Sequence, residues 1–185
     1  MPVLPPVRQL NRFFLLSWLI AVVQVAGLQG ARQFTEAAVA GWTLAATISY
    51  AFIYLLPALL LAHLLRRLLA YRSMRSAPAV LAAAAVGLTG LTQVLLFADR
   101  LIHDMYGFHI NGFVIDLVLT PGGIAALGAG MGTRIAAGLI VLAFFAAQAG
   151  AYAWVMRHDG AGSWLGNIRW RWVLLSLVLL STGER

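Results

Sequence analysis

Residues 37–65, AAVAGWTLAATISYAFIYLLPALLLAHLL, are the long apolar stretch that decides the class of fold. As a helix this stretch would be about 43 Å long at 1.5 Å per residue. That length exceeds the hydrocarbon core of a bilayer, which is about 30 Å thick. We therefore expect a membrane-spanning helix that tilts, bends or protrudes. Pro57 lies inside it and favours a kink near Ile53, because proline has no N–H for the carbonyl one turn earlier.

The composition of the whole chain fits a membrane protein. Hydrophobic residues make up 62% of it, charged residues 10%, and the mean hydropathy is +0.87, whereas a soluble domain has about 25% charged residues. All 13 basic residues are arginine, against 6 acidic residues. The arginines cluster between apolar stretches, which indicates membrane topology and argues against a nucleic-acid partner. Cysteine is absent, which excludes disulfides and thiolate metal sites.

The other apolar stretches complete the prediction of an all-α membrane protein. Residues 1–12 are interpreted as a non-helical cytoplasmic tail, because three of the first six residues are proline. Residues 13–185 would form one transmembrane helical domain. Its four complete spans cover about 13–31, 37–65, 77–98 and 135–156, and a partial fifth covers 170–181. The fifth is about 18 Å long and cannot cross a bilayer, so we expect a chain cut off within it.

Two features of the spans predict how they pack. The third span is rich in alanine and glycine, which allow helices to approach closely and favour a central position in the bundle. Gln24, Gln93 and Gln148 are the deepest polar side chains, and we expect them to form hydrogen bonds between helices. No span carries a charge at its centre, which argues against an ion-coupled transporter.

The distribution of arginines predicts the orientation of the chain. The N-terminal residues, the 66–75 connection and the 157–171 connection are arginine-rich, and they alternate with poorer connections. By the positive-inside rule the rich set, and with it the N-terminus, is cytoplasmic. The cluster formed by Arg66, Arg67, Arg72 and Arg75 would either hold anionic lipid headgroups or serve as an orientation signal alone; both alternatives stay open.

Residues 99–116 concentrate the polar chemistry, with three of the six acidic residues and two of the four histidines. If the third helix continues past Asp99, then Asp99 pairs with His103, and Arg100 with Asp104, at a spacing of four residues. A divalent-ion site would need a third convergent ligand. We therefore predict hydrogen-bonded or ion-paired structure at the membrane surface, with no metal and no cofactor.

A short amphipathic helix is predicted next. Asn111 is a suitable N-cap, and apolar residues recur with helical spacing from Ile110 to Val118. About ten residues cannot span a bilayer, so the helix should lie in the outer interface with Asp116 toward water. The chain shows no Ser–His or paired intramembrane Asp arrangement, and we assign no catalytic residue. The candidates for lipid contact or structure are Asp99, His103, His109, Asn111, Asp116, Arg66, Arg67, Arg72 and Arg75.

The segment FADRLIHDMYGFHINGFVIDLVLTPGG, residues 97–123, resembles the membrane region of sulfatase-like inner-membrane proteins. These include lipoteichoic-acid synthase, phosphoethanolamine and phosphoglycerol transferases, and the YejM (PbgA) type. In that family an acidic residue ends the third helix, and an aromatic step and a His-x-Asn element precede an interfacial helix. The matching positions here are Asp99, Phe108, His109, Asn111 and residues 117–120.

The resemblance implies five membrane helices in a bacterial inner membrane, followed by an extracytoplasmic domain of the alkaline-phosphatase/sulfatase fold. The nucleophilic Thr or Ser and the metal ligands of that domain are not in this chain, so transferase activity does not carry over. The first hypothesis is therefore a membrane anchor and lipid-contact domain, with membrane lipids and an envelope protein as partners. The alternatives are a free-standing small membrane protein, such as a transporter subunit or assembly factor, and an enzyme that uses the 99–116 cluster.

Overall fold

The computed structural model describes residues 4–28, 37–72, 74–120 and 130–158. Within these ranges the chain is almost entirely helical and has no strand. The helices are α1 (Val7–Leu28), α2 (Ala37–Tyr71), α3 (Ala77–Tyr106), α4 (Gly112–Leu119) and α6 (Met131–Arg157). All except α4 are long and apolar enough to cross a membrane. The chain is thus an all-α multi-pass membrane protein, as predicted; the predicted fifth helix at 170–181 lies outside the described residues.

Helix α1 begins six residues before the predicted start of the first span. The amide groups of Gln9 and Leu10 donate to the carbonyl of Pro6, at 3.0 and 3.3 Å. The prediction of a non-helical tail over residues 1–12 was therefore wrong for residues 7–12. The prolines precede the first turn, where a missing N–H leaves no partner unsatisfied. Leu10 is fully buried, so packing extends the helix into this part of the chain.

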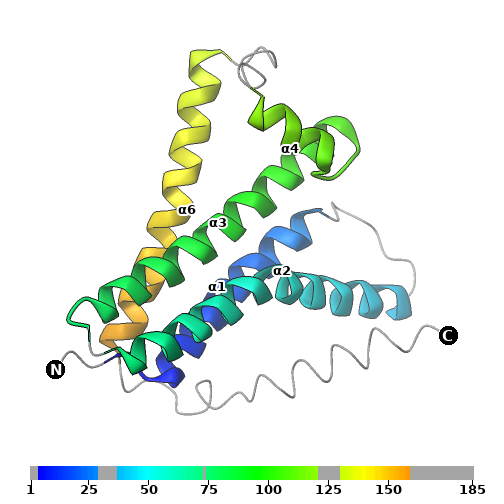
Figure 1. Ribbon diagram of the computed structural model, residues 1–185. Helices are drawn as coiled ribbons and strands as arrows, with labels where there is room; N and C mark the ends of the chain where they lie inside the picture. The colour runs from blue at the N-terminus through cyan, green and yellow to red at the C-terminus, as the bar shows by residue number, and fades with distance from the viewer. Residues whose placement is uncertain (1–3, 29–36, 73, 121–129, 159–185) are drawn as a thin grey trace.

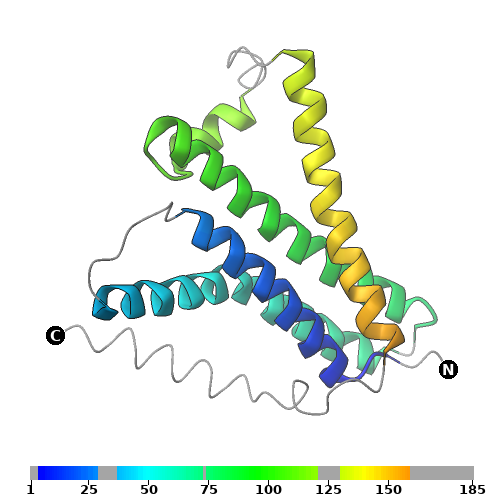
Figure 2. The same cartoon turned by 180° about the vertical axis from the view of Figure 1, so that it is seen from behind.

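The other spans are also longer than predicted. Helix α2 continues past Arg66 and Arg67 to Tyr71, α3 passes Asp99 and ends at Tyr106, and α6 begins at Met131. Arginine and leucine favour helix, and a polar residue at a membrane surface gives no reason to stop one. What ends α3 is Gly107, whose φ of 75° is a left-handed conformation that glycine adopts without steric cost. Helix α2 is unbroken at Pro57, and it bends near its middle in both views (Figures 1 and 2).

The four long helices converge at one end of the molecule and separate toward the other (Figures 1 and 2). The start of α1, the end of α2, the start of α3 and the end of α6 meet at the convergent end. Phe13 and Phe14 are fully buried there, and the Phe13 ring contacts the Tyr152 ring edge-on with centroids 5.3 Å apart. At the other end the first half of α6 is exposed, including Ile135, Leu139 and Leu142.

Helix α3 packs against α1, α2 and α6, as predicted for a central helix, and α1 likewise packs against α2, α3 and α6. A chain of polar side chains joins it to two of these helices. Gln24 donates to the side-chain oxygen of Gln93, and Gln93 donates to the backbone carbonyl of Ser17 at 2.8 Å. The Ser17 hydroxyl donates to the side-chain oxygen of Gln148 at 2.6 Å. The three glutamines do form hydrogen bonds between helices, as predicted.

Gly90 lets α3 and α6 approach each other. A Cβ atom at this position would lie 2.7 Å from Cδ1 and 2.8 Å from Cε1 of the Phe145 ring. Such distances are well below van der Waals contact, so the ring occupies the space that a side chain would need. Gly87, one turn earlier on α3, has no atom within 4 Å of such a Cβ. Gly90 is therefore the glycine that packing requires, and Gly87 provides a matched control.

We expect Gly90→Ala to lower the stability of the bundle by about 1–3 kcal/mol, because overpacking forces Phe145 away from α3. Gly87→Ala should be neutral or slightly stabilising, since alanine favours helix over glycine. Thermal unfolding of the purified variants in detergent measures both effects. In a Phe145→Leu background the cost of Gly90→Ala should shrink. Equal behaviour of the two glycine variants would contradict the close approach.

Candidate functional site

Charged residues divide between the two ends of the bundle. Arg8 and Arg12 lie in the first turns of α1, four more arginines lie between the end of α2 and the start of α3, and Arg157 ends α6. All of these lie at the convergent end (Figure 1). The acidic residues within the described ranges lie at the other end, in the last turns of α3 and in α4. We call the first the arginine end and the second the acidic end.

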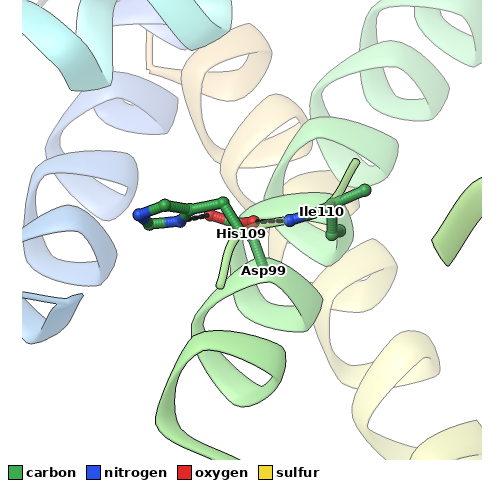
Figure 3. Close-up of polar contacts among 3 residues, drawn as sticks. All are labelled: Asp99, His109 and Ile110. Carbon is green, nitrogen blue, oxygen red and sulfur yellow. Dashed lines mark hydrogen bonds and ion pairs between the residues drawn. The ribbon is translucent and has the colours of Figure 1, made fainter. Parts of the chain in front are cut away.

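Asp99 is the centre of the acidic end. It lies on α3, and only 8% of its surface is exposed. One carboxylate oxygen, Oδ2, lies 2.8 Å from Nδ1 of His109, and the other, Oδ1, accepts the backbone N–H of Ile110 at 2.6 Å. Figure 3 shows the carboxylate between these two residues. An ionised carboxylate only accepts hydrogen bonds, so Nδ1 of His109 carries the proton of this bond.

The predicted pairing of Asp99 with His103 was wrong. The chain turns back after Gly107, so His109 reaches Asp99 from beyond the end of the helix. His103 instead stacks on the His109 ring, with centroids 4.7 Å apart. The second predicted pair is present: Arg100 and Asp104 lie 3.7 Å apart with both side chains about half exposed. Such an exposed pair contributes little to stability.

Asn111 caps α4, as the sequence predicts. Its side-chain oxygen accepts the backbone N–H of Val114 at 3.2 Å, which satisfies one of the free donors of the first turn. Asp116 is exposed, and its backbone carbonyl accepts both the N–H and the hydroxyl of Thr120, at 2.9 and 2.8 Å. The apolar side chains of Phe113 and Leu119 are 68% and 76% exposed. This short helix therefore presents apolar surface outside the bundle.

At the arginine end only one member of the predicted cluster is tied to the bundle by a described side-chain bond. Nε of Arg66 donates to the backbone carbonyl of Pro5 at 2.9 Å, which holds the start of α1 against α2. Arg67, Arg72 and Arg75 are exposed. The structure thus separates a structural arginine from three that face outward. The spacing in the sequence does not show this difference.

The structure adds polar residues that the sequence did not single out. Asn11 is buried, and its side-chain oxygen lies 2.9 Å from Nε2 of His63 on α2. Nδ1 of His63 lies 2.8 Å from the carbonyl of Leu59 in the same helix. Asn11 fell within the predicted tail, so only an earlier start of α1 could have revealed this contact. The contact joins α1 and α2 and stands apart from the acidic end.

At the acidic end Asp99 binds His109, His103 stacks on the His109 ring, and Asn111 caps α4 two residues later. Asp116 is an exposed residue of α4 at the same end, and the arginine cluster lies at the arginine end. No group of three or more His, Cys, Asp or Glu among the described residues could hold a metal ion. The arrangement provides hydrogen bonds and one ion pair. It does not place a nucleophile beside a base.

Comparisons of this chain with protein-family models, with curated proteins and with solved structures find no match.

Asn111→Ala should destabilise α4 by about 1 kcal/mol, because the Val114 amide loses its acceptor. Hydrogen exchange of the amides of Val114 and Ile115, which donate to the side chain and the backbone carbonyl of Asn111, should then be faster by roughly fivefold. Asn111→Asp, which keeps an acceptor oxygen at the N-cap, should retain the wild-type protection. The prediction fails if Asn111→Ala exchanges no faster than the wild-type protein.

Proposed function

We propose that this chain is the membrane anchor of a bacterial inner-membrane protein, with its N-terminus in the cytoplasm and its acidic end outside. The observation that carries the proposal is the separation of charge between the two ends of the bundle. Seven of the nine arginines in the described ranges lie at the arginine end. Asp99, Asp104 and Asp116 lie at the acidic end, together with Arg100 and Arg134. Cytoplasmic surfaces of membrane proteins are enriched in Lys and Arg.

The resemblance of residues 97–123 to sulfatase-like inner-membrane proteins supports an anchor in the cell envelope. The positions that carry the resemblance are those that the acidic end uses. Asp99 binds His109 through its side chain, and Asn111 caps the helix that follows. Both roles require a particular side chain: a carboxylate bonded to an imidazole, and an N-cap with an acceptor oxygen. This requirement is a physical reason for the pattern shared with that family. Under this proposal α4 lies in the outer interface, and no residue of the chain is catalytic.

The arginine end supports the second part of the proposal, contact with anionic lipids. Arg67, Arg72 and Arg75 are exposed, near the junction of α2 and α3. Arginine offers a planar set of donors suited to phosphate oxygens. A basic residue near an anionic membrane surface contributes about 1 kcal/mol. Three of them acting together would favour acidic headgroups by about a hundredfold.

Single cysteines test the orientation, because the chain has none of its own. Asp116→Cys, at an exposed position of α4, should react with a membrane-impermeant maleimide in intact spheroplasts. Ser76→Cys, at an exposed position before α3, should react only after the membrane is permeabilised. Both variants should label equally in detergent. The reverse pattern in spheroplasts would place the arginine end outside and refute the proposed orientation.

The lipid contact is tested by replacing Arg67, Arg72 and Arg75 together. In reconstituted protein the triple glutamine variant should bind anionic phospholipid roughly a hundredfold more weakly, at about 1 kcal/mol per arginine. The triple lysine variant keeps the charge and should retain most of the binding. Native mass spectrometry in nanodiscs of mixed anionic and zwitterionic lipid measures the retention. Unchanged retention in the glutamine variant would leave the cluster as an orientation signal alone.

A further inference from the structure

Helix α4 lies outside the main packing of the bundle. The extensive helix packing in the described residues involves α1, α2, α3 and α6, and α4 takes no part in it. Figure 1 shows α4 beside the end of α3, away from the convergent end of the bundle. The side-chain hydrogen bonds that join this region to α3 both end on Asp99. Stacking of His109 on His103 and of Phe108 on Tyr106 adds ring contacts to the same segment. Among the described hydrogen bonds, those that place α4 against α3 depend on one carboxylate.

The two bonds to Asp99 hold consecutive residues immediately before the N-cap of α4. His109 and Ile110 are fixed by the two carboxylate oxygens, and Asn111 then starts the helix. Since consecutive residues are held, both the place and the direction of the helix start are determined. The direction of α4 in turn decides where the exposed apolar side chains of Phe113, Ile115 and Leu119 lie.

The strength of the bond between Asp99 and His109 depends on the protonation state of His109. With a neutral imidazole, the bond joins a neutral donor to a nearly buried carboxylate. With an imidazolium, it becomes an ion pair at 2.8 Å, which adds Coulombic attraction to a bond that the carboxylate already strengthens. The His109 side chain is 61% exposed, so protons reach it from solvent. Histidine is the side chain that ordinarily changes charge between pH 5 and 8.

Other charged groups face this pair from two helices. On α3, the His103 ring stacks on His109, and a charge on it would oppose a charge on His109. Arg100 is paired with Asp104, and its guanidinium packs against Gly27 of α1. On α2, the phenol of Tyr54 lies within electrostatic range of Asp99.

From this geometry we propose that Asp99, His109 and Ile110 form a protonation-sensitive latch that fixes α4 to the end of α3. The latch is closed when His109 is protonated and loosens as the pH rises and the imidazolium is lost. It thereby sets how the apolar side chains of α4 meet the membrane surface. The latch involves only residues of this chain, so it operates whichever way the chain crosses the membrane.

Hydrogen exchange at the Ile110 amide reports directly on the latch, because that N–H donates to Asp99. In nanodiscs, after correction for the intrinsic pH dependence of exchange, protection should be about fivefold higher at pH 5.5 than at pH 8. A spin label on Ile115→Cys should in parallel be less mobile at pH 5.5. Protection that is independent of pH in the wild-type protein would overturn the proposal.

Three variants separate the latch from a general effect of pH on the bundle. His109→Gln cannot gain a proton and should abolish the pH dependence, while its amide N–H group can still donate a hydrogen bond. Asp99→Asn should lower protection at both pH values. Asp104→Asn removes an exposed acid on the same helix and should keep the wild-type response. A wild-type response in His109→Gln, or loss of the response in Asp104→Asn, would contradict the assignment to the Asp99–His109 pair.

Discussion

Hydrocarbon offers no hydrogen-bond partner, so every polar group that crosses a membrane must find one within the protein. Backbone groups meet this demand by forming helices, and polar side chains meet it by bonding between helices. The chain from Gln24 through Gln93 and Ser17 to Gln148 does so in part for α1, α3 and α6. Within the described residues, Oε1 of Gln24 and Nε2 of Gln148 are buried without a hydrogen-bond partner. Without these contacts each glutamine would carry the cost of an unpaired amide in an apolar medium.

The acidic end obeys the same constraint at the membrane surface. Asp99 is almost fully buried, and a buried carboxylate is stable only with charge or hydrogen-bond partners. The chain supplies them by turning back through Gly107 and returning His109 and Ile110 to the carboxylate. The start of α4 is a consequence of satisfying Asp99. The Asp99 carboxylate therefore has two roles: it needs partners because it is buried, and its bond to His109 forms the proposed latch.

Much of this architecture could be predicted from the sequence, and the failures have physical causes. Apolar length and the scarcity of charge predicted four membrane helices, and the asparagine before an apolar periodic segment predicted the cap of α4. Helix ends were the weak point. Pro5 and Pro6 suggested a tail, although α1 begins directly after them, and polar residues after position 98 suggested an end to α3 that Gly107 in fact provides. Local preference does not show where packing continues a helix.

The sequence by itself determined the class of protein and the distribution of arginines along the chain, because both depend on composition and on order along one dimension. Only the tertiary structure decided which polar groups meet. Spacing along a helix favoured His103 as the partner of Asp99, and the turn after Gly107 delivered His109 in its place. Likewise, Arg66 differs from Arg67, Arg72 and Arg75 only because α1 lies beside it and offers the carbonyl of Pro5. Contacts between segments far apart along the chain follow from how helices pack, and residue order alone does not contain that information.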